Sequence, residues 1–89
     1  MITQNITIIN KLGLHARAAS KLVNLASQFG SSVTLQNKGN NVNAKSIMGV
    51  MMLAASQGTE MVLEVEGEDE DDCSNAIINL INNRFDEEE

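Results

Sequence analysis

The sequence has very few aromatic residues and little that would constrain its chain covalently. Its 89 residues include no Trp, no Tyr, no Pro and only 2 Phe, so any core must be aliphatic. A small aliphatic core leaves little room for the deep internal pocket that most metabolic enzymes use. We therefore expect a single domain over residues 1–89, with any chemistry at its surface and shared with another protein.

The chain also lacks features of secreted and membrane proteins. Its one cysteine, Cys73, cannot form an internal disulfide, so the sequence does not indicate an oxidising compartment. No apolar run approaches the roughly 20 residues that span a bilayer. Residues 1–5 lack the basic flank and apolar stretch of a signal peptide. We expect a cytoplasmic protein that does not insert into membranes.

Charged residues are separated along the chain. All 12 carboxylates lie within residues 60–89, whereas five of the six basic residues precede Gly58. The first 59 residues carry +5 and the last 30 carry −11. The basic half indicates a docking face for an anion or an acidic partner. The alternative is that the acidic segments, 68–72 and 86–89, only keep the protein soluble.

Two classes of function fit this composition poorly. A net charge of −6 and only 2 Phe as aromatic residues for base stacking argue against a nucleic-acid binder. The acidic run 68–72 lacks the glycine and the terminal glutamate of a calcium loop. We expect neither a metal site nor a cofactor.

Hydrophobic periodicity predicts the order of the elements. Alternating apolar residues predict strands over 2–9 and around residues 33–35, 42–44 and 61–65, with a hairpin turn at 37–40. Helical spacing predicts helices over 16–29 (capped by Gly30), over 46–53 (with Ser46 as N-cap) and from about residue 67 to Arg84. The order β-α-β-β-α-β-α predicts an α+β fold, an open-faced sandwich with a four-stranded antiparallel sheet and helices on one face.

The only histidine, His15, lies where a predicted loop meets the first helix. Helix-initial amides, here those of Ala16 and Arg17, lack internal partners and favour an anion. Imidazole is a good nucleophile near neutral pH, and the Arg17 guanidinium can hold phosphate oxygens. Small Ala16, Ala18 and Ala19 are expected to leave the site open. An ordinary exposed or capping histidine is the alternative that these residues leave open.

Two segments resemble the HPr family, the histidine-containing phosphocarriers of the bacterial phosphoenolpyruvate-dependent phosphotransferase system. Residues 13–17, Gly-Leu-His-Ala-Arg, resemble the phosphohistidine motif of that family. Residues 45–53, Lys-Ser-Ile-Met-Gly-Val-Met-Met-Leu, resemble its short regulatory helix. Because chain length and element order fit as well, the resemblance covers essentially the whole chain.

The resemblance implies a role for each matched residue. His15 would accept a phosphoryl group through Nδ1 from enzyme I and pass it to an EIIA-type protein, with Arg17 stabilising the phosphorylated state. Ser46 would be a regulatory phosphorylation site for an HPr kinase/phosphorylase. Partners would dock on an exposed apolar patch formed by Ile47, Met48 and Met51. Core packing is the alternative for these three, but the apolar residues of 47–53 surround the helix, so some must face outward.

One departure and two alternatives accompany the resemblance. The family motif usually continues with proline, whereas this chain has Ala18; because no reacting group is lost, we expect Ala18→Pro to keep phosphotransfer. The main rival is an interaction module that carries no phosphate, although binding alone requires neither His15 nor Arg17. We expect a monomeric, stoichiometric carrier. Residues 10–13 and 84–87 resemble the nitrogen-related branch of the family, and residues 46–49 resemble its sugar-transport branch equally well. We favour the nitrogen-related branch, with the sugar-transport branch as the alternative.

Overall fold

Four strands form one antiparallel sheet in the computed structural model, which describes residues 1–86. Their order across the sheet is β1-β4-β2-β3, so the first strand lies at one edge and the third at the other. The strands are β1 (Ile2–Thr7), β2 (Ser32–Asn37), β3 (Asn40–Asn43) and β4 (Glu60–Glu66). The predicted turn at 37–40 joins β2 to β3, with Lys38 and Gly39 both at positive φ.

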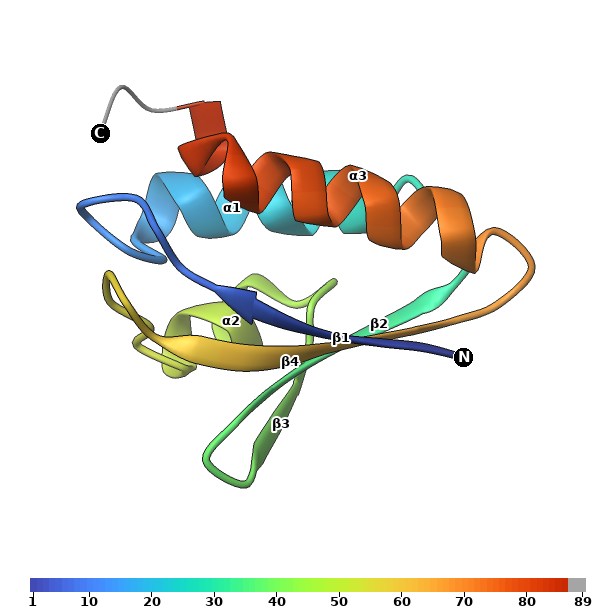
Figure 1. The fold of residues 1–89 in the computed structure, drawn as a ribbon, viewed down its shortest axis with the longest axis horizontal. Coiled ribbons are helices and arrows are strands. Elements are labelled where there is room, and N and C mark those ends of the chain that lie inside the picture. Colours follow the sequence, from blue (N-terminus) through green and yellow to red (C-terminus); the bar gives the residue numbers. More distant parts are fainter. Residues whose placement is uncertain (87–89) are drawn as a thin grey trace.

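Three helices complete the fold: α1 (Ala16–Ala26), α2 (Ile47–Met52) and α3 (Glu70–Asn82). The helices α1 and α3 lie side by side across one face of the sheet (Figure 1), and α2 packs against α1 and β3. The predicted α+β class and the order β-α-β-β-α-β-α are therefore confirmed. No helix within residues 1–86 is long and apolar enough to cross a membrane.

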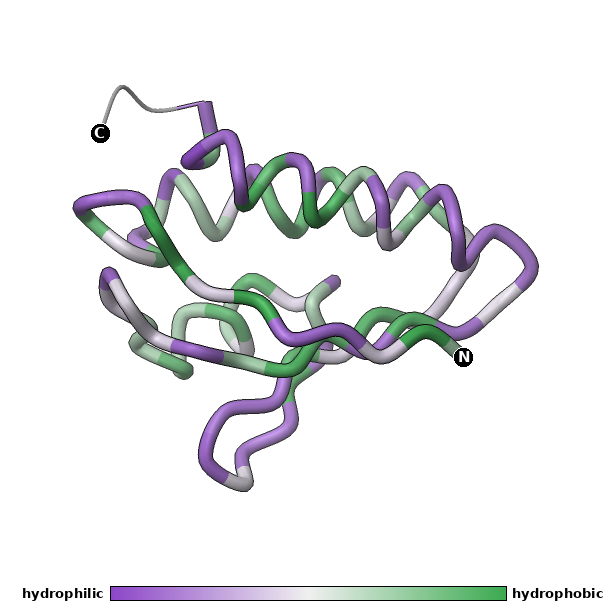
Figure 2. The backbone as a smooth tube through the Cα atoms, in the orientation of Figure 1, coloured by the Kyte–Doolittle hydropathy of each residue, from purple (hydrophilic) through white to green (hydrophobic). Residues whose placement is uncertain are grey.

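The core lies between the sheet and the two long helices. Ile6, paired with Met61, and Leu35, paired with Leu63, point their side chains into it. Ile6 and Ile8 are both buried, although β1 ends at Thr7 and not at the predicted residue 9. Apolar residues recur along the strands and the long helices, whereas the β2–β3 turn is hydrophilic (Figure 2). Side chains from alternate strand positions and from one face of each long helix thus form one aliphatic layer.

The first helix is shorter than predicted. It ends at Ala26, and residues 27–29 form a tighter turn in which the amides of Gln28 and Phe29 donate to carbonyls three residues back, at 3.1 and 3.2 Å. Gly30 does not adopt the left-handed conformation of a capping glycine. Its amide instead donates to the Asp69 carboxylate at 2.9 Å. A contact with a residue distant in sequence therefore terminates this segment. This explains why helical spacing alone predicted a helix that is too long.

The C-terminal segment also differs from expectation. The third helix begins at Glu70, and Arg84, expected at its end, lies beyond it in a single turn, η1 (Arg84–Asp86), with left-handed backbone angles. Phe85 in this turn is fully buried, and its carbonyl accepts a hydrogen bond from Lys21 Nζ at 2.7 Å. Except for Asp86, the acidic run predicted at 86–89 lies outside the described residues.

Candidate functional site

His15 occupies the N-cap position of α1, at the junction where the sequence placed it. Its backbone is extended, and its carbonyl accepts the first helical hydrogen bond from the Ala19 amide at 2.8 Å. Its Nδ1 atom accepts a hydrogen bond from the Arg17 amide at 3.3 Å. The imidazole thus takes the part usually played by a serine or aspartate side chain at a helix start. The ring is partly exposed, so another protein can reach it.

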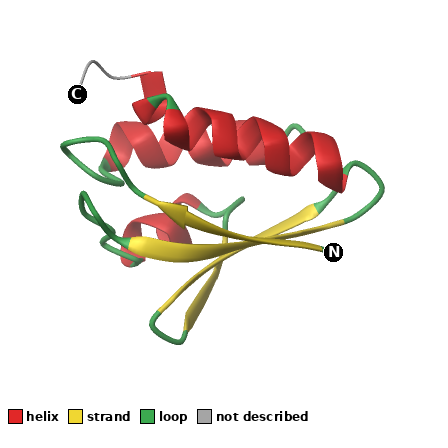
Figure 3. Cartoon of the chain, in the orientation of Figure 1, coloured by secondary structure: helices red, strands yellow, loops and turns green. Residues whose placement is uncertain are grey.

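Two loops fix the position of this histidine. The loop between β1 and α1 and the loop between α2 and β4 lie at the same end of the molecule (Figure 3). They are joined directly before His15, where the Leu14 amide donates to the Ala55 carbonyl at 2.8 Å. The buried Asn10 side chain also donates to the Gly13 carbonyl at 2.8 Å. A side-chain hydrogen bond to Gly13 and a backbone hydrogen bond from Leu14 therefore hold the chain directly before His15.

Gly13 has a backbone angle suited to glycine, with φ of +69°. A Cβ atom there would overlap the Ala55 carbonyl oxygen and would lie 2.8 Å from Ser56 Cα. The glycine is therefore required twice, for its left-handed conformation and for the close approach of the two loops.

The alanines near His15 do not all do what was expected of them. Ala16 is exposed beside the histidine, but Ala18 and Ala19 are fully buried and face the core. The expectation that all three keep the site open is wrong for these two, because their helical positions point toward the sheet. Access to His15 therefore depends on Ala16 and on the exposed Arg17, which makes no salt bridge within residues 1–86.

The basic residues of the first half are spread over several elements of the fold. Lys21 and Lys45 donate from Nζ to the carbonyls of Phe85 and Phe29, at 2.7 and 2.8 Å. Lys38 lies in the β2–β3 turn. Two of the five cations thus also make tertiary hydrogen bonds, and Arg17 lies two residues after His15, exposed.

The second helix presents apolar side chains to solvent. The three residues expected in a docking patch are exposed, Ile47 by 39%, Met48 by 71% and Met51 by 43%. Met52, which was not predicted, is the most exposed large apolar side chain of the described residues, at 79%. Its position four residues after Met48 is the sequence signal that could have identified it. We call Ile47, Met48, Met51 and Met52 the apolar patch.

Further contacts place this patch near the histidine. On the opposite side of α2, Val50 is fully buried, and Gly49 lies against Val42 of β3. Ala55, three residues after the patch, is the residue whose carbonyl binds the Leu14 amide. Leu12, in the loop before His15, is also exposed, and no periodic pattern in the sequence marks it.

Ser46 precedes the patch and caps α2, as predicted. Its Oγ accepts a hydrogen bond from the Gly49 amide at 3.2 Å, and its side chain is exposed. The hydroxyl therefore has a structural role that is independent of any modification.

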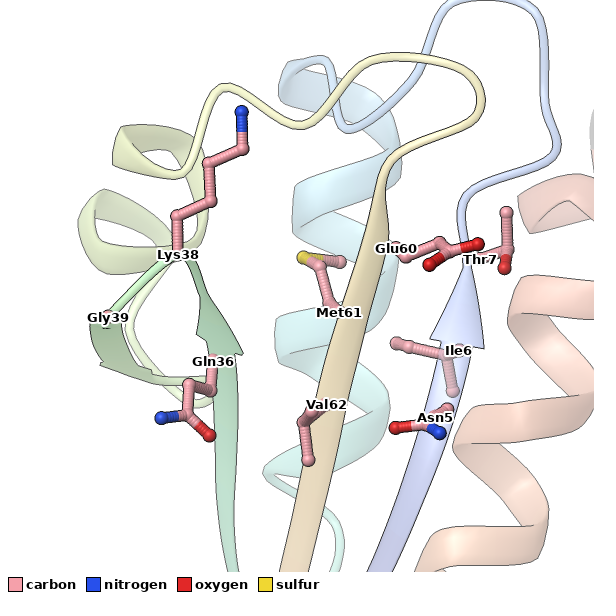
Figure 4. A pocket seen from close by; sticks show the side chains of 9 residues that line it. All are labelled: Asn5, Ile6, Thr7, Gln36, Lys38, Gly39, Glu60, Met61 and Val62. Carbon is pink, nitrogen blue, oxygen red and sulfur yellow. The ribbon is translucent and has the colours of Figure 1, made fainter.

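A surface hollow and the single thiol lie outside the site. The hollow is on the face of the sheet away from α1, between the ends of β1, β2 and β4 (Figure 4), and it does not include His15. Cys73 is buried in α3, and burial raises the pKa of its thiol. Within residues 1–86, no three His, Cys, Asp or Glu side chains are grouped as metal ligands.

Comparisons with known proteins agree with this geometry. The family model described as the PTS HPr component phosphorylation site matches residues 2–83. The phosphocarrier protein HPr of Pseudomonas aeruginosa is 58% identical over 85 residues, which cover 94% of each chain. A crystal structure of HPr from Thermoanaerobacter tengcongensis has a TM-score of 0.96 at 45% identity and covers 100% of both chains. A second structure, described as a dimer of the same HPr, has a TM-score of 0.79 at 45% identity and covers 98% of this chain and 100% of its own.

The sheet order, the three helices and the histidine-capped helix define a small phosphocarrier. This chain belongs to the HPr family, the phosphocarriers of the phosphotransferase system. The resemblance seen in residues 13–17 and 45–53 is thereby confirmed.

Proposed function

We propose that this protein accepts a phosphoryl group on Nδ1 of His15 from the phosphohistidine of enzyme I and passes it to an EIIA-type protein. The hydrogen bond from the Arg17 amide to His15 Nδ1, 3.3 Å long, carries the proposal. A hydrogen-bond acceptor needs a lone pair, so the proton of the neutral ring is on Nε2. Nδ1 is therefore the nitrogen that can attack phosphorus.

The helix start then receives the transferred group. The N–P bond of the donor breaks as a new N–P bond forms at His15. The Arg17 amide loses its acceptor on Nδ1 and donates to a phosphoryl oxygen instead, while the Ala16 amide and the positive end of α1 favour the same negative charge. The exposed Arg17 guanidinium can add charge-assisted hydrogen bonds. Transfer to the acceptor reverses these changes, so the protein is both substrate and product.

The apolar patch supplies the docking surface in this proposal. Burial of a methionine or isoleucine side chain stabilises a complex by about 1.5–3 kcal/mol, which makes this surface suited to a partner. Both enzyme I and the acceptor would use it in turn, since flexible methionines adapt to different surfaces. Phosphorylation of Ser46 by an HPr kinase/phosphorylase would place a dianion directly before the patch and weaken docking.

The test is intact mass after incubation with enzyme I and phosphoenolpyruvate, with His15→Ala as control. We expect one added phosphoryl group, lost on mild acid treatment and absent from the control. An unmodified protein that still binds enzyme I from the same cell would contradict the proposal and favour the interaction module. The phosphorylated protein, presented to sugar-system and nitrogen-system acceptors in turn, identifies the branch. Light scattering tests the prediction of a monomer.

A further inference from the structure

The methionines of the chain are distributed unevenly over its surface. Three of the five lie in α2, where Met48 and Met52 are 71% and 79% exposed and Met51 is 43% exposed. Met61 is 3% exposed in the core, and Met1 lies at the N-terminus. Positions 48, 51 and 52 are three and four residues apart, so they share one side of the helix. We call these three residues the methionine face; hydrophobic residues dominate α2 (Figure 2).

Packing holds this face outward. Val50 is fully buried, and a Cβ atom at Gly49 would lie 3.4 Å from Val42 Cβ and 3.6 Å from the Asn43 carbonyl oxygen. This side of α2 therefore faces the rest of the fold. The Ser46 cap fixes the first turn of α2. The thioether sulfurs therefore cannot withdraw into the core by a small rotation of the helix.

Exposed thioethers react with two-electron oxidants. Hydrogen peroxide transfers one oxygen atom to the sulfur: the O–O bond breaks, an S–O bond forms, the sulfur is oxidised by two electrons and the peroxide is reduced to water. The product is a sulfoxide, which is polar and chiral, and methionine sulfoxide reductases reverse its formation. The competing thiol of Cys73 is buried in α3.

We propose that the methionine face of α2 is a reversible oxidation site that controls docking of this carrier on its partners. The proposal rests on the proposed function, because it assigns regulation to the same docking surface. A sulfoxide buried against an apolar partner surface lacks a hydrogen-bond partner, and such a group weakens a complex roughly tenfold. Oxidation at more than one position removes docking while His15 and the Arg17 amide stay in place.

The experiment measures modification and transfer on the same samples. The full chain is treated with dilute hydrogen peroxide, and peptide mapping follows each methionine. We expect Met48, Met52 and the 67% exposed Met1 to oxidise first, Met51 later and Met61 last. Phosphoryl acceptance from enzyme I at limiting concentration is expected to fall at least tenfold, and to recover after treatment with methionine sulfoxide reductases and dithiothreitol.

A matched variant distinguishes the effect of oxidising the methionine face from other effects of peroxide. In the triple variant Met48→Leu, Met51→Leu, Met52→Leu, Met1 and Met61 remain oxidisable. Each protein is compared with its own untreated form, so any change in basal rate cancels. We expect the rate ratio of the variant to stay near one; a loss equal to that of the natural chain would overturn the proposal.

The readouts distinguish this proposal from the proposed function. If the untreated chain accepts no phosphoryl group, the proposed function fails. The oxidation proposal is then tested separately, by comparing the affinity for enzyme I before and after oxidation. Equal oxidation rates at Met61 and Met48 would overturn the selectivity of the site. An unchanged transfer rate and unchanged binding after full conversion of the methionine face would overturn its control of docking.

Discussion

Substitution of Gly13 by alanine tests the junction that holds His15. The glycine has φ of +69°, a conformation that costs an L-residue about 1–2 kcal/mol. Alanine also restricts the unfolded chain, which offsets about 0.4–1 kcal/mol of that cost. Backbone conformation alone therefore accounts for a net loss of about 1 kcal/mol.

The close approach of the two loops adds a second cost. The new Cβ would overlap the Ala55 carbonyl oxygen and lie 2.8 Å from Ser56 Cα. Both neighbours are backbone, so the loops must separate, and the hydrogen bond from Leu14 to Ala55, 2.8 Å long, is lost or strained. An unsatisfied buried backbone group costs about 1–3 kcal/mol. The total is about 2–4 kcal/mol.

The control is Gly39→Ala in the β2–β3 turn. Gly39 has φ of +85°, but no atom lies within 4 Å of the position that a Cβ would take there, so only the conformational cost applies. For a chain of this length, 1 kcal/mol corresponds to about 4–8 °C in Tm. Thermal unfolding should therefore show a loss of about 4–8 °C for Gly39→Ala and about 8–32 °C for Gly13→Ala.

A functional measurement completes this test. Below both unfolding temperatures, Gly13→Ala should accept phosphoryl groups from enzyme I more slowly, because the residue preceding His15 has moved. Gly39→Ala should match the natural chain. Equal losses of Tm in the two variants, or full transfer in Gly13→Ala, would refute the reasoning that the loop contact positions the histidine.

Four other substitutions, at three positions, have defined outcomes. Ser46→Ala removes the cap of α2 and should lower the free energy of unfolding by about 1 kcal/mol in urea titrations; Ser46→Asp should weaken enzyme I binding, and unchanged affinity would contradict regulation at this site. Hydrogen bonds from the Ser31 hydroxyl and from the Gly30 amide hold the pKa of Asp69 below its ordinary value. This stabilisation is complete above that ordinary value and is lost as pH falls through the lower folded-state pKa, so Asp69→Asn should be less stable than the natural chain at pH 7, and the difference should shrink as pH falls below the ordinary carboxyl value; a difference independent of pH would contradict it. Ala54, at φ of +50°, follows the end of α2, and Ala54→Gly should raise the free energy of unfolding by up to about 1 kcal/mol; a fall in urea stability would argue against strain there.

Local signals in the sequence predicted most of the elements. Alternation identified β4, where Met61, Leu63 and Val65 are all buried. The turn at 37–40 was recognisable because Gly39 tolerates positive φ. Ser46 was recognisable as a cap because a serine precedes an apolar run. Each of these features depends on residues within one turn or one strand, which is why the sequence was sufficient for them.

Predictions failed where partners distant in sequence decide the outcome. The end of α1 depends on Asp69, whose carboxylate binds the amides of Gly30 and Ser31, both at 2.9 Å. The burial of Phe85 depends on a left-handed turn after α3 that no residue pattern marks. The contact of Lys21 with the carbonyl of Phe85, 64 residues away, was likewise not marked by any local pattern in the sequence.

The candidate site combines both kinds of information. The sequence by itself determined that a histidine would begin the first helix and that the second helix had more apolar residues than a small core could bury. Only the tertiary structure decided which nitrogen of His15 accepts the Arg17 amide, and which side of α2 faces solvent. Helix starts and periodicity are set by neighbouring residues, whereas the position of Gly13 against Ala55 and of α2 against β3 requires the folded sheet to bring them together.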